Sequence, residues 1–136
     1  MRALCLTLAL ALALPAQAQE AGPEFTDSSG ASLRFLDKLT SETGDVTLSR
    51  GQSAKFGRLL VQLDSCRYPT DNPASDAEAH LTILEDSSRT SLFSGWMLAS
   101  SPALSALDHP RYDVWVLSCV LPEAAPPEAT SPVEGE

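Results

Sequence analysis

The sequence predicts an all-β fold, a small antiparallel sandwich or barrel of about seven strands with one short helical turn. Three observations lead to this class. Apolar and polar residues alternate along several short runs, which is typical of half-buried strands. Turn-forming residues separate these runs. Only one short segment has the composition of a helix.

Three half-buried strands are expected between residues 33 and 85. In each of them every second residue is apolar and is expected to face inward. These residues are Leu33 and Phe35; Leu59, Val61 and Leu63; and Ala77, Ala79, Leu81 and Ile83. Turns are predicted at Thr43-Gly44-Asp45, Arg50-Gly51-Gln52, Lys55-Phe56-Gly57 and residues 68–76. His80 falls on the solvent side of its strand.

The helical turn is predicted just before the last strand. Pro102 suits the first helical position, and Ser100 or Ser101 can cap the turn. Pro110 ends it, because proline disfavours a helical conformation in the preceding residue. The run YDVWVLSC, which begins at Tyr112, is apolar on both faces and predicts a central strand covered on each side.

The N-terminus has the pattern of a secretory signal peptide over residues 1–18. An apolar run from Ala3 to Leu14 follows Arg2, and Ala16-Gln17-Ala18 supplies the small residues of a cleavage site. The run is too short to span a bilayer. We expect an exported protein of the bacterial periplasm, with no membrane insertion after cleavage.

Composition divides the remaining chain into three parts. Residues 19–31 are expected to form a flexible linker and residues 32–119 a single β-domain. Residues 120–136 contain four prolines and four glutamates, which predicts a disordered, acidic, proline-rich tail.

Charge limits the class of partner. The whole chain has a net charge of −9, and the predicted domain alone has eleven acidic and eight basic residues. Nucleic acid and anionic membrane surfaces both require a basic patch, so neither is expected as a partner.

Two cysteines remain after the predicted cleavage, Cys66 and Cys119. In an oxidising compartment such a pair more often forms a disulfide, and two buried free thiols are the alternative. The alternation of RLLVQLDSC places Cys66 on the outward side. Pairing therefore needs a bulge or a strand end near Asp64-Ser65, and we expect the strand to end there.

The residues that could support catalysis or bind a metal are sparse. Asp108, His109 and Asp113 invite a hydrolase hypothesis, but no G-x-S-x-G motif accompanies them. His80 and His109 are far apart and lack the spacing of metal ligands. No phosphate-binding or dinucleotide motif is present. We expect no catalytic residue, no metal and no cofactor.

An aromatic-rich segment is the candidate for partner binding. It contains Phe93, Trp96, Met97, His109 and Tyr112. Exposed Trp and Tyr side chains serve protein or sugar recognition, whereas core packing is the alternative. For Trp115, core packing is favoured.

A longer motif resembles a known family. The segment 93–119 contains G-W-M-x-A-S-S-P-A-L-S-A-L, then H-P-x-Y-D-V-W-V and a closing Cys, and LDKLT, AKFGRLLV and SCRYP precede it. This pattern is similar to an exported alphaproteobacterial family that carries a domain of unknown function. The resemblance implies a secreted single domain in which Cys66 and Cys119 pair. It implies no activity.

Together these features predict a non-catalytic periplasmic β-domain that binds an envelope protein, as an accessory or assembly module of a complex. The alternative is a small hydrolase, or a glycan-active or glycan-binding protein, that uses the Asp108-His109 region and the nearby aromatics.

Overall fold

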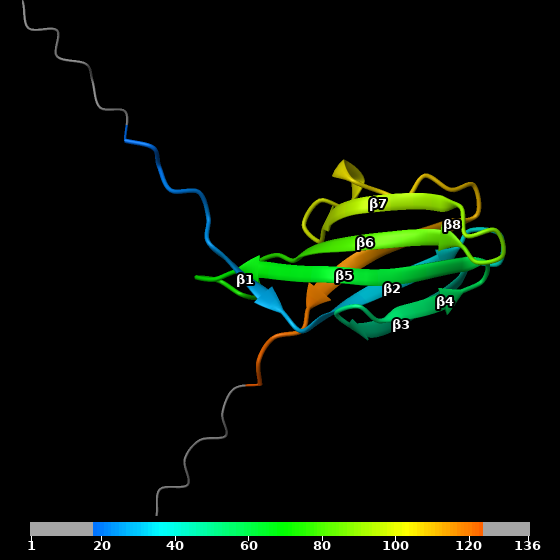
Figure 1. Ribbon diagram of the computed structural model, residues 1–136, viewed down its shortest axis with the longest axis horizontal. Helices are drawn as coiled ribbons and strands as arrows, with labels where there is room; N and C mark the ends of the chain where they lie inside the picture. The colour runs from blue at the N-terminus through cyan, green and yellow to red at the C-terminus, as the bar shows by residue number, and fades with distance from the viewer. Residues whose placement is uncertain (1–17, 124–136) are drawn as a thin grey trace, which may run out of the picture.

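The computed structural model describes residues 18–123, which form two antiparallel sheets packed face to face (Figure 1). The strands are Phe25–Ser28 (β1), Gly30–Asp37 (β2), Glu42–Ser49 (β3), Ser53–Phe56 (β4), Leu59–Pro69 (β5), Glu78–Glu85 (β6), Ser91–Leu98 (β7) and Tyr112–Cys119 (β8). One sheet has the order β1-β5-β6-β7, with β4 also paired to β5, and the other has the order β3-β2-β8. The predicted all-β sandwich is confirmed.

The alternating apolar residues form the core between the two sheets. Six inward side chains of β5 and β6 are 0% exposed: Leu59, Val61, Leu63, Ala79, Leu81 and Ile83. Leu33 and Phe35 of β2 belong to the same buried cluster. A fully buried side chain of the size of leucine stabilises the fold by about 1.5–3 kcal/mol. The strand periodicity predicted from the sequence therefore identifies the core.

The prediction that the last strand is central is wrong, because within residues 18–123 β8 pairs only with β2 and forms an edge. Its inward residues Tyr112, Val114 and Val116 are buried. Trp115 and Leu117 are partly exposed. The apolar character on both faces of β8 thus reflects partly exposed side chains at a sheet edge.

β5 continues through Asp64 to Pro69, so the strand end expected near Asp64-Ser65 is wrong and a bulge takes its place. Leu63 pairs with Leu81 and Ser65 pairs with His80, which leaves Asp64 as the extra residue. The extra residue reverses the alternation, so the next cysteine turns inward and is 0% exposed.

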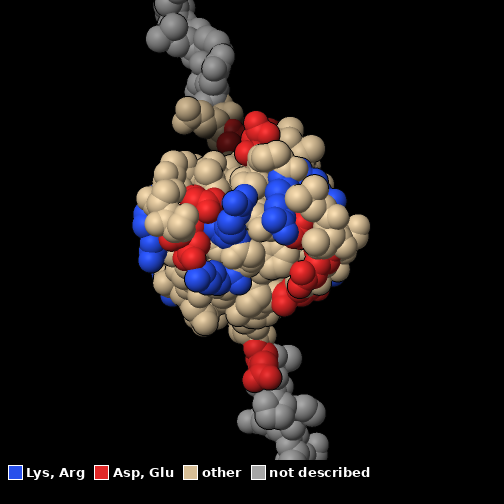
Figure 2. Space-filling view, turned by 90° about the vertical axis from the view of Figure 1, so that its right-hand side faces the viewer, with Lys and Arg blue, Asp and Glu red and all other residues tan. Residues whose placement is uncertain are grey.

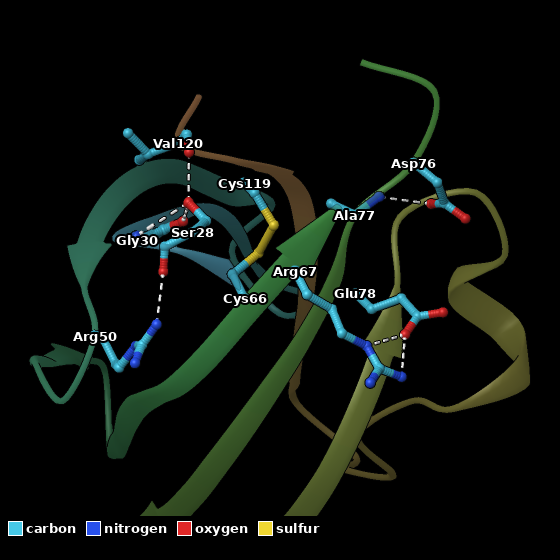
Figure 3. Close-up of a disulfide and its surroundings, with 10 residues drawn as sticks. All are labelled: Ser28, Gly30, Arg50, Cys66, Arg67, Asp76, Ala77, Glu78, Cys119 and Val120. Carbon is cyan, nitrogen blue, oxygen red and sulfur yellow. Dashed lines mark hydrogen bonds and ion pairs between the residues drawn. A yellow bond between two sulfur atoms is a disulfide. The ribbon is translucent and has the colours of Figure 1, made fainter. Parts of the chain in front are cut away.

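This cysteine, Cys66, forms a disulfide with Cys119 of β8, with the Cα atoms 5.8 Å apart (Figure 3). The bond joins the five-stranded sheet to the three-stranded sheet. Pairing of the two cysteines is therefore present in the structure, and the bulge makes it possible.

The flexible linker expected over residues 19–31 is wrong for its second half. β1 pairs with the end of β5, and Ala31 of β2 is 0% exposed. The Ser28 hydroxyl lies within hydrogen-bond distance of the Gly30 and Val120 carbonyl oxygens, and the Val120 N–H donates to the Gly30 carbonyl at 2.9 Å (Figure 3). The two segments that flank the domain are thus held together.

The predicted helical turn is confirmed as a short 3-10 turn over Pro102–Leu104. The predicted serine cap is wrong, since Ser101 makes no side-chain capping hydrogen bond. The Ser100 hydroxyl donates instead to a carboxylate oxygen of Asp76, at 2.7 Å.

The turns at Gly51 and Gly57 are confirmed, and both glycines have a positive φ, of 81° and 54°. The turn predicted at residues 43–45 is wrong, because this segment lies within β3. The chain turns earlier, and Ser41 at φ 61° occupies the left-handed region.

Over residues 18–123, no helix is long and apolar enough to cross a membrane. The predicted signal peptide lies outside the described residues except for Ala18. Most of the predicted tail, residues 124–136, also lies outside them.

Candidate functional site

The bulge in β5 positions the first residues of the candidate site. Asp64 Oδ2 accepts hydrogen bonds from the Thr82 hydroxyl and from His80 Nδ1, each at 2.7 Å. Asp64 Oδ1 accepts a third, from the Gln62 amide at 3.0 Å. An ionised carboxylate can only accept, so a neutral His80 carries its hydrogen on Nδ1. The bulged residue thereby fixes the orientation of the His80 ring.

Trp96 of β7 lies opposite His80 on the outer face of the sheet, and the two rings meet edge to face with centroids 5.3 Å apart. The Arg67 guanidinium carbon lies 4.4 Å from the Trp96 ring centroid and 4.8 Å from that of Phe25. Arg67 Nη2 is also 2.6 Å from Glu78 Oε2. Trp96 is nevertheless 37% exposed. We call these five residues the Arg67–Trp96 surface.

The Arg67–Trp96 surface draws its side chains from β1, β5, β6 and β7, so paired backbone holds every one of them. Trp and Arg are enriched among the residues that contribute most to protein interfaces. Their contacts within the surface restrict the rotamers before a partner arrives, which lowers the entropic cost of binding. The arrangement is suited to recognition of another surface.

The structure separates the residues predicted to bind a partner. Met97 and Tyr112 are 1% and 2% exposed, so a partner-binding role is wrong for both. Phe93 is partly buried against the core, and a Cβ atom at Gly95 would lie 3.5 Å from its Cζ atom. Of the β7 aromatics, Trp96 is therefore the one that presents its ring to solvent.

His109 closes a turn ahead of β8. Its Nδ1 atom accepts backbone hydrogen bonds from Arg111 and Tyr112, at 3.0 and 3.1 Å. Its carbonyl oxygen accepts a hydrogen bond from Lys38 Nζ at 2.7 Å, and the same ammonium lies 3.5 Å from Asp113. The structure therefore gives His109 and Asp113 positions in loop packing, without bringing them together around a nucleophile.

An adjacent ion pair joins the start of β8 to the end of β2. Arg111 donates to both carboxylate oxygens of Asp37, with Nη2–Oδ2 at 2.7 Å. The Leu39 N–H donates to the same carboxylate at 2.9 Å. The hydrogen bonds from Arg111, with smaller contributions from the Leu39 and Thr40 N–H groups, lower the pKa of Asp37 to about 2 against the opposing effect of burial. We call Asp37, Arg111 and His109 the Asp37 corner.

The sequence-based candidates did not include Phe25, Asp64, Arg67 or Glu78. Phe25 lies in a segment whose composition indicated a linker. Arg67 depends on the bulge, because without it the alternation of β5 would turn its side chain inward, whereas Asp64 lies on the outward side in either case. For Arg67, the signal that could have found it is the pairing of Cys66, which turns the following residue outward.

The described residues offer neither a surface of one charge sign in the view of Figure 2 nor a metal-binding cluster as a further candidate site. Both signs of charge are interspersed over the end of the sandwich that Figure 2 shows. Lys55 and Asp86 form one of the ion pairs, at 2.7 Å. Within residues 18–123, no group of three or more His, Cys, Asp or Glu side chains could hold a metal ion.

Residues 31–119 match a family described as "Uncharacterized protein conserved in bacteria (DUF2155)". The chain belongs to this family. The DUF2155 match runs from β2 to the last residue of β8 and includes both cysteines of the disulfide. It leaves β1, which carries Phe25, outside the matched region.

A curated relative of the DUF2155 chain comes from Rickettsia prowazekii (strain Madrid E) and is described as "Uncharacterized protein RP359". The two are 31% identical over 99 residues, which cover 71% of this chain and 64% of the relative. The chain thus spans less than two thirds of the length of that relative. No solved structure matches. Resemblance to a domain of unknown function with an alphaproteobacterial member is confirmed, whereas the motif stays a prediction.

Proposed function

We propose that this DUF2155 domain is a non-catalytic, exported module that binds an envelope protein through the Arg67–Trp96 surface, as an accessory or assembly factor of a periplasmic complex. The exposed Trp96 ring, held by Arg67 and His80, carries the proposal. An indole that is fixed in the free protein and still accessible has the properties of an interface anchor.

Two observations support the exported location. The apolar run over residues 3–14, followed by Ala16-Gln17-Ala18, has the pattern of a cleavable signal. The Cys66–Cys119 disulfide suits an oxidising compartment such as the periplasm.

We further infer that the motif around GWMxASSPALSAL and HPxYDVWV marks an exported alphaproteobacterial branch of the family. A relative from Rickettsia prowazekii supports the alphaproteobacterial part of this inference. Residues of the motif also have structural roles. Ser100 bonds Asp76, His109 closes the turn before β8, and Tyr112 fills the core.

The enzymatic and glycan-binding alternatives receive less support. His109 Nδ1 is occupied by two backbone N–H groups, which leaves only Nε2 for acid–base chemistry. A sugar platform needs an open ring face, and Arg67 covers one face of Trp96. Neither arrangement favours these alternatives over a protein partner.

The test is capture of partners from gently crosslinked native envelopes with the tagged protein, expressed from its full-length sequence and read by mass spectrometry. We expect Trp96→Ala to lower recovery of a stoichiometric partner at least about tenfold, which corresponds to about 1.4 kcal/mol.

Trp115→Ala is the matched control, because Trp115 is the other tryptophan and is partly exposed on β8 of the other sheet. It should leave recovery unchanged. Retention of the partner by a folded Trp96→Ala variant, with circular dichroism like that of the wild type, would show that this surface is not the docking site.

A further inference from the structure

The edge strands of the sandwich differ in how they are protected against pairing. In the described part of the chain five strands form edges. Four of these carry charged side chains: Asp27 on β1, Glu42 and Asp45 on β3, Lys55 on β4 and Asp113 on β8. β7, with the sequence SLFSGWML, carries neither a charged residue nor a proline. Charges and prolines on an edge are the usual means by which proteins prevent another strand from pairing there.

The outward backbone groups of β7 make few hydrogen bonds, although the 3-10 turn over Pro102–Leu104 lies close to the strand. Apart from its ladder with β6, its one backbone hydrogen bond within residues 18–123 runs from the Ser101 N–H to the Leu98 carbonyl, at 3.3 Å. A bulge at Leu92 interrupts the first part of this edge, and residues 93–98 form a regular, uncharged stretch with open hydrogen-bonding groups. Such a stretch is a template for an added strand.

A hollow of about 390 Å³ opens where β7 ends. Ala99 and Ser100, the two residues after β7, line it together with Pro73, Asp76, Leu117 and Leu121. Its walls are mostly apolar, Asp76 supplies a carboxylate, and no Lys, Arg or His lines it. The hollow therefore adjoins the C-terminal end of β7.

The Asp76 carboxylate is held in its charged form. It accepts hydrogen bonds from the Ser100 hydroxyl at 2.7 Å, the Ser100 N–H at 3.0 Å and the Ala77 N–H at 2.8 Å. Burial raises the pKa of Asp76, but these hydrogen bonds outweigh it and the pKa is lowered. A negative charge at the end of an apolar hollow matches a side chain with an apolar stem and a cationic head.

We propose that an extended segment of the partner protein adds to the β7 edge as a further strand and inserts a lysine or arginine into the hollow at Asp76. This inference rests on the proposed function and names the form in which the partner is recognised. Backbone pairing along β7 supplies affinity, and the hollow selects the side chain.

Charge favours a partner over a second copy of this chain. The strand that a second copy would place along β7 by symmetry is β7 itself, which contains no basic residue for Asp76. Two copies would also bring together chains that each carry a net charge of −9. The occupant is therefore a segment of another protein with a basic residue.

The experiment selects a displayed library of random linear peptides on the protein expressed from its full-length sequence. We expect the selected peptides to be enriched in Lys or Arg. Hydrogen–deuterium exchange should show that a bound peptide protects the amides of residues 91–98. Ser94→Lys places a charge on the edge strand and should weaken binding at least about tenfold.

Asp76→Asn should weaken binding by a similar factor, whereas Glu42→Gln on β3 removes the same charge elsewhere and should leave it unchanged. Peptides without basic residues, equal affinity for the Asp76→Asn variant, or unprotected β7 amides would each overturn the inference. Protection that rises with protein concentration in the absence of peptide would identify a second copy as the occupant and overturn it as well.

The outcomes also separate this inference from the proposed function. An envelope partner that depends on Trp96 but leaves β7 exchange unchanged would reject strand addition alone. The absence of any partner dependent on Trp96 would reject the proposed function.

Discussion

The Asp37 corner and the Arg67–Trp96 surface both pair an arginine with a carboxylate next to an aromatic ring, but their surroundings differ. The Asp37 side chain is 7% exposed, and backbone N–H groups of the following turn occupy its remaining acceptor positions. Arg67 is 39% exposed and lies over two aromatic rings. The same pair of groups therefore closes a turn in one place and supports a partly exposed tryptophan in the other.

The two regions differ in which further groups contact the arginine and the carboxylate of each ion pair. At the Asp37 corner these further groups are backbone N–H donors, so the ion pair holds β2 and β8 in register near their ends. On the Arg67–Trp96 surface the further groups are aromatic side chains, and one of them, Trp96, faces solvent. A matched set of substitutions should thus lower stability at the corner and lower binding at the surface.

The largest effect on stability is expected from removal of the Cys66–Cys119 disulfide, whose Cys66 lies next to Arg67. Replacing Cys66 and Cys119 together with alanine frees a loop of 54 residues, counted over 66–119. The free energy of unfolding should fall by about 4 kcal/mol on loop entropy alone, measured by urea denaturation. A loss below about 1 kcal/mol would show that the bridge adds little to the fold.

A smaller effect is expected from Asp37→Asn, and it should depend on pH. Because the folded pKa of Asp37 is lowered from 3.8 to about 2, the ionised carboxylate stabilises the fold above the unfolded value. This stabilisation is lost as pH falls from 3.8 towards 2. The variant should melt several degrees lower at neutral pH and lose part of the acid dependence seen in the wild type.

Thermal unfolding across this pH range checks the expectation, with Glu78→Gln as the control at the other ion pair. The control leaves Asp37 in place and should keep the wild-type acid dependence. If Asp37→Asn and wild type lose stability in parallel between pH 4 and pH 2, another carboxylate is responsible.

The smallest effect on stability is expected from Arg67→Lys. The substitution keeps the charge but removes the planar group that lies over Phe25 and Trp96. The free energy of unfolding should fall by about 0.5–1 kcal/mol. Partner recovery should fall more steeply, because the Trp96 ring loses its support. Equal recovery with Arg67→Lys and wild type would show that charge alone suffices.

Sequence patterns predict the parts of this fold that follow from alternation. Leu59 to Leu63 and Ala77 to Ile83 alternate cleanly, and their inward residues form the core. The pattern misjudges β8 because Trp115 and Leu117 are large and apolar yet lie on the outer side of an edge strand. Alternation within one strand does not report how many neighbours that strand has.

The candidate site was less predictable because it depends on contacts between strands. One extra residue, Asp64, reverses the faces of the second half of β5, and nothing in the local sequence marks it. Met97 is next to Trp96 but points to the opposite face, so the two cannot share one surface. The position of Trp96 opposite His80 fixes which of them faces solvent.

The contacts of Ser28 and Gly30 with Val120, which join the two ends of the domain, have a mechanical consequence. Tension applied at Glu24 and Leu121 first meets the Ser28–Val120 contacts and the β1–β5 ladder. The Cys66–Cys119 bond then carries the load past everything between the two cysteines. β6 and β7 lie inside this shielded loop. The strand that carries Trp96 therefore bears no direct load while the ends of the domain are pulled.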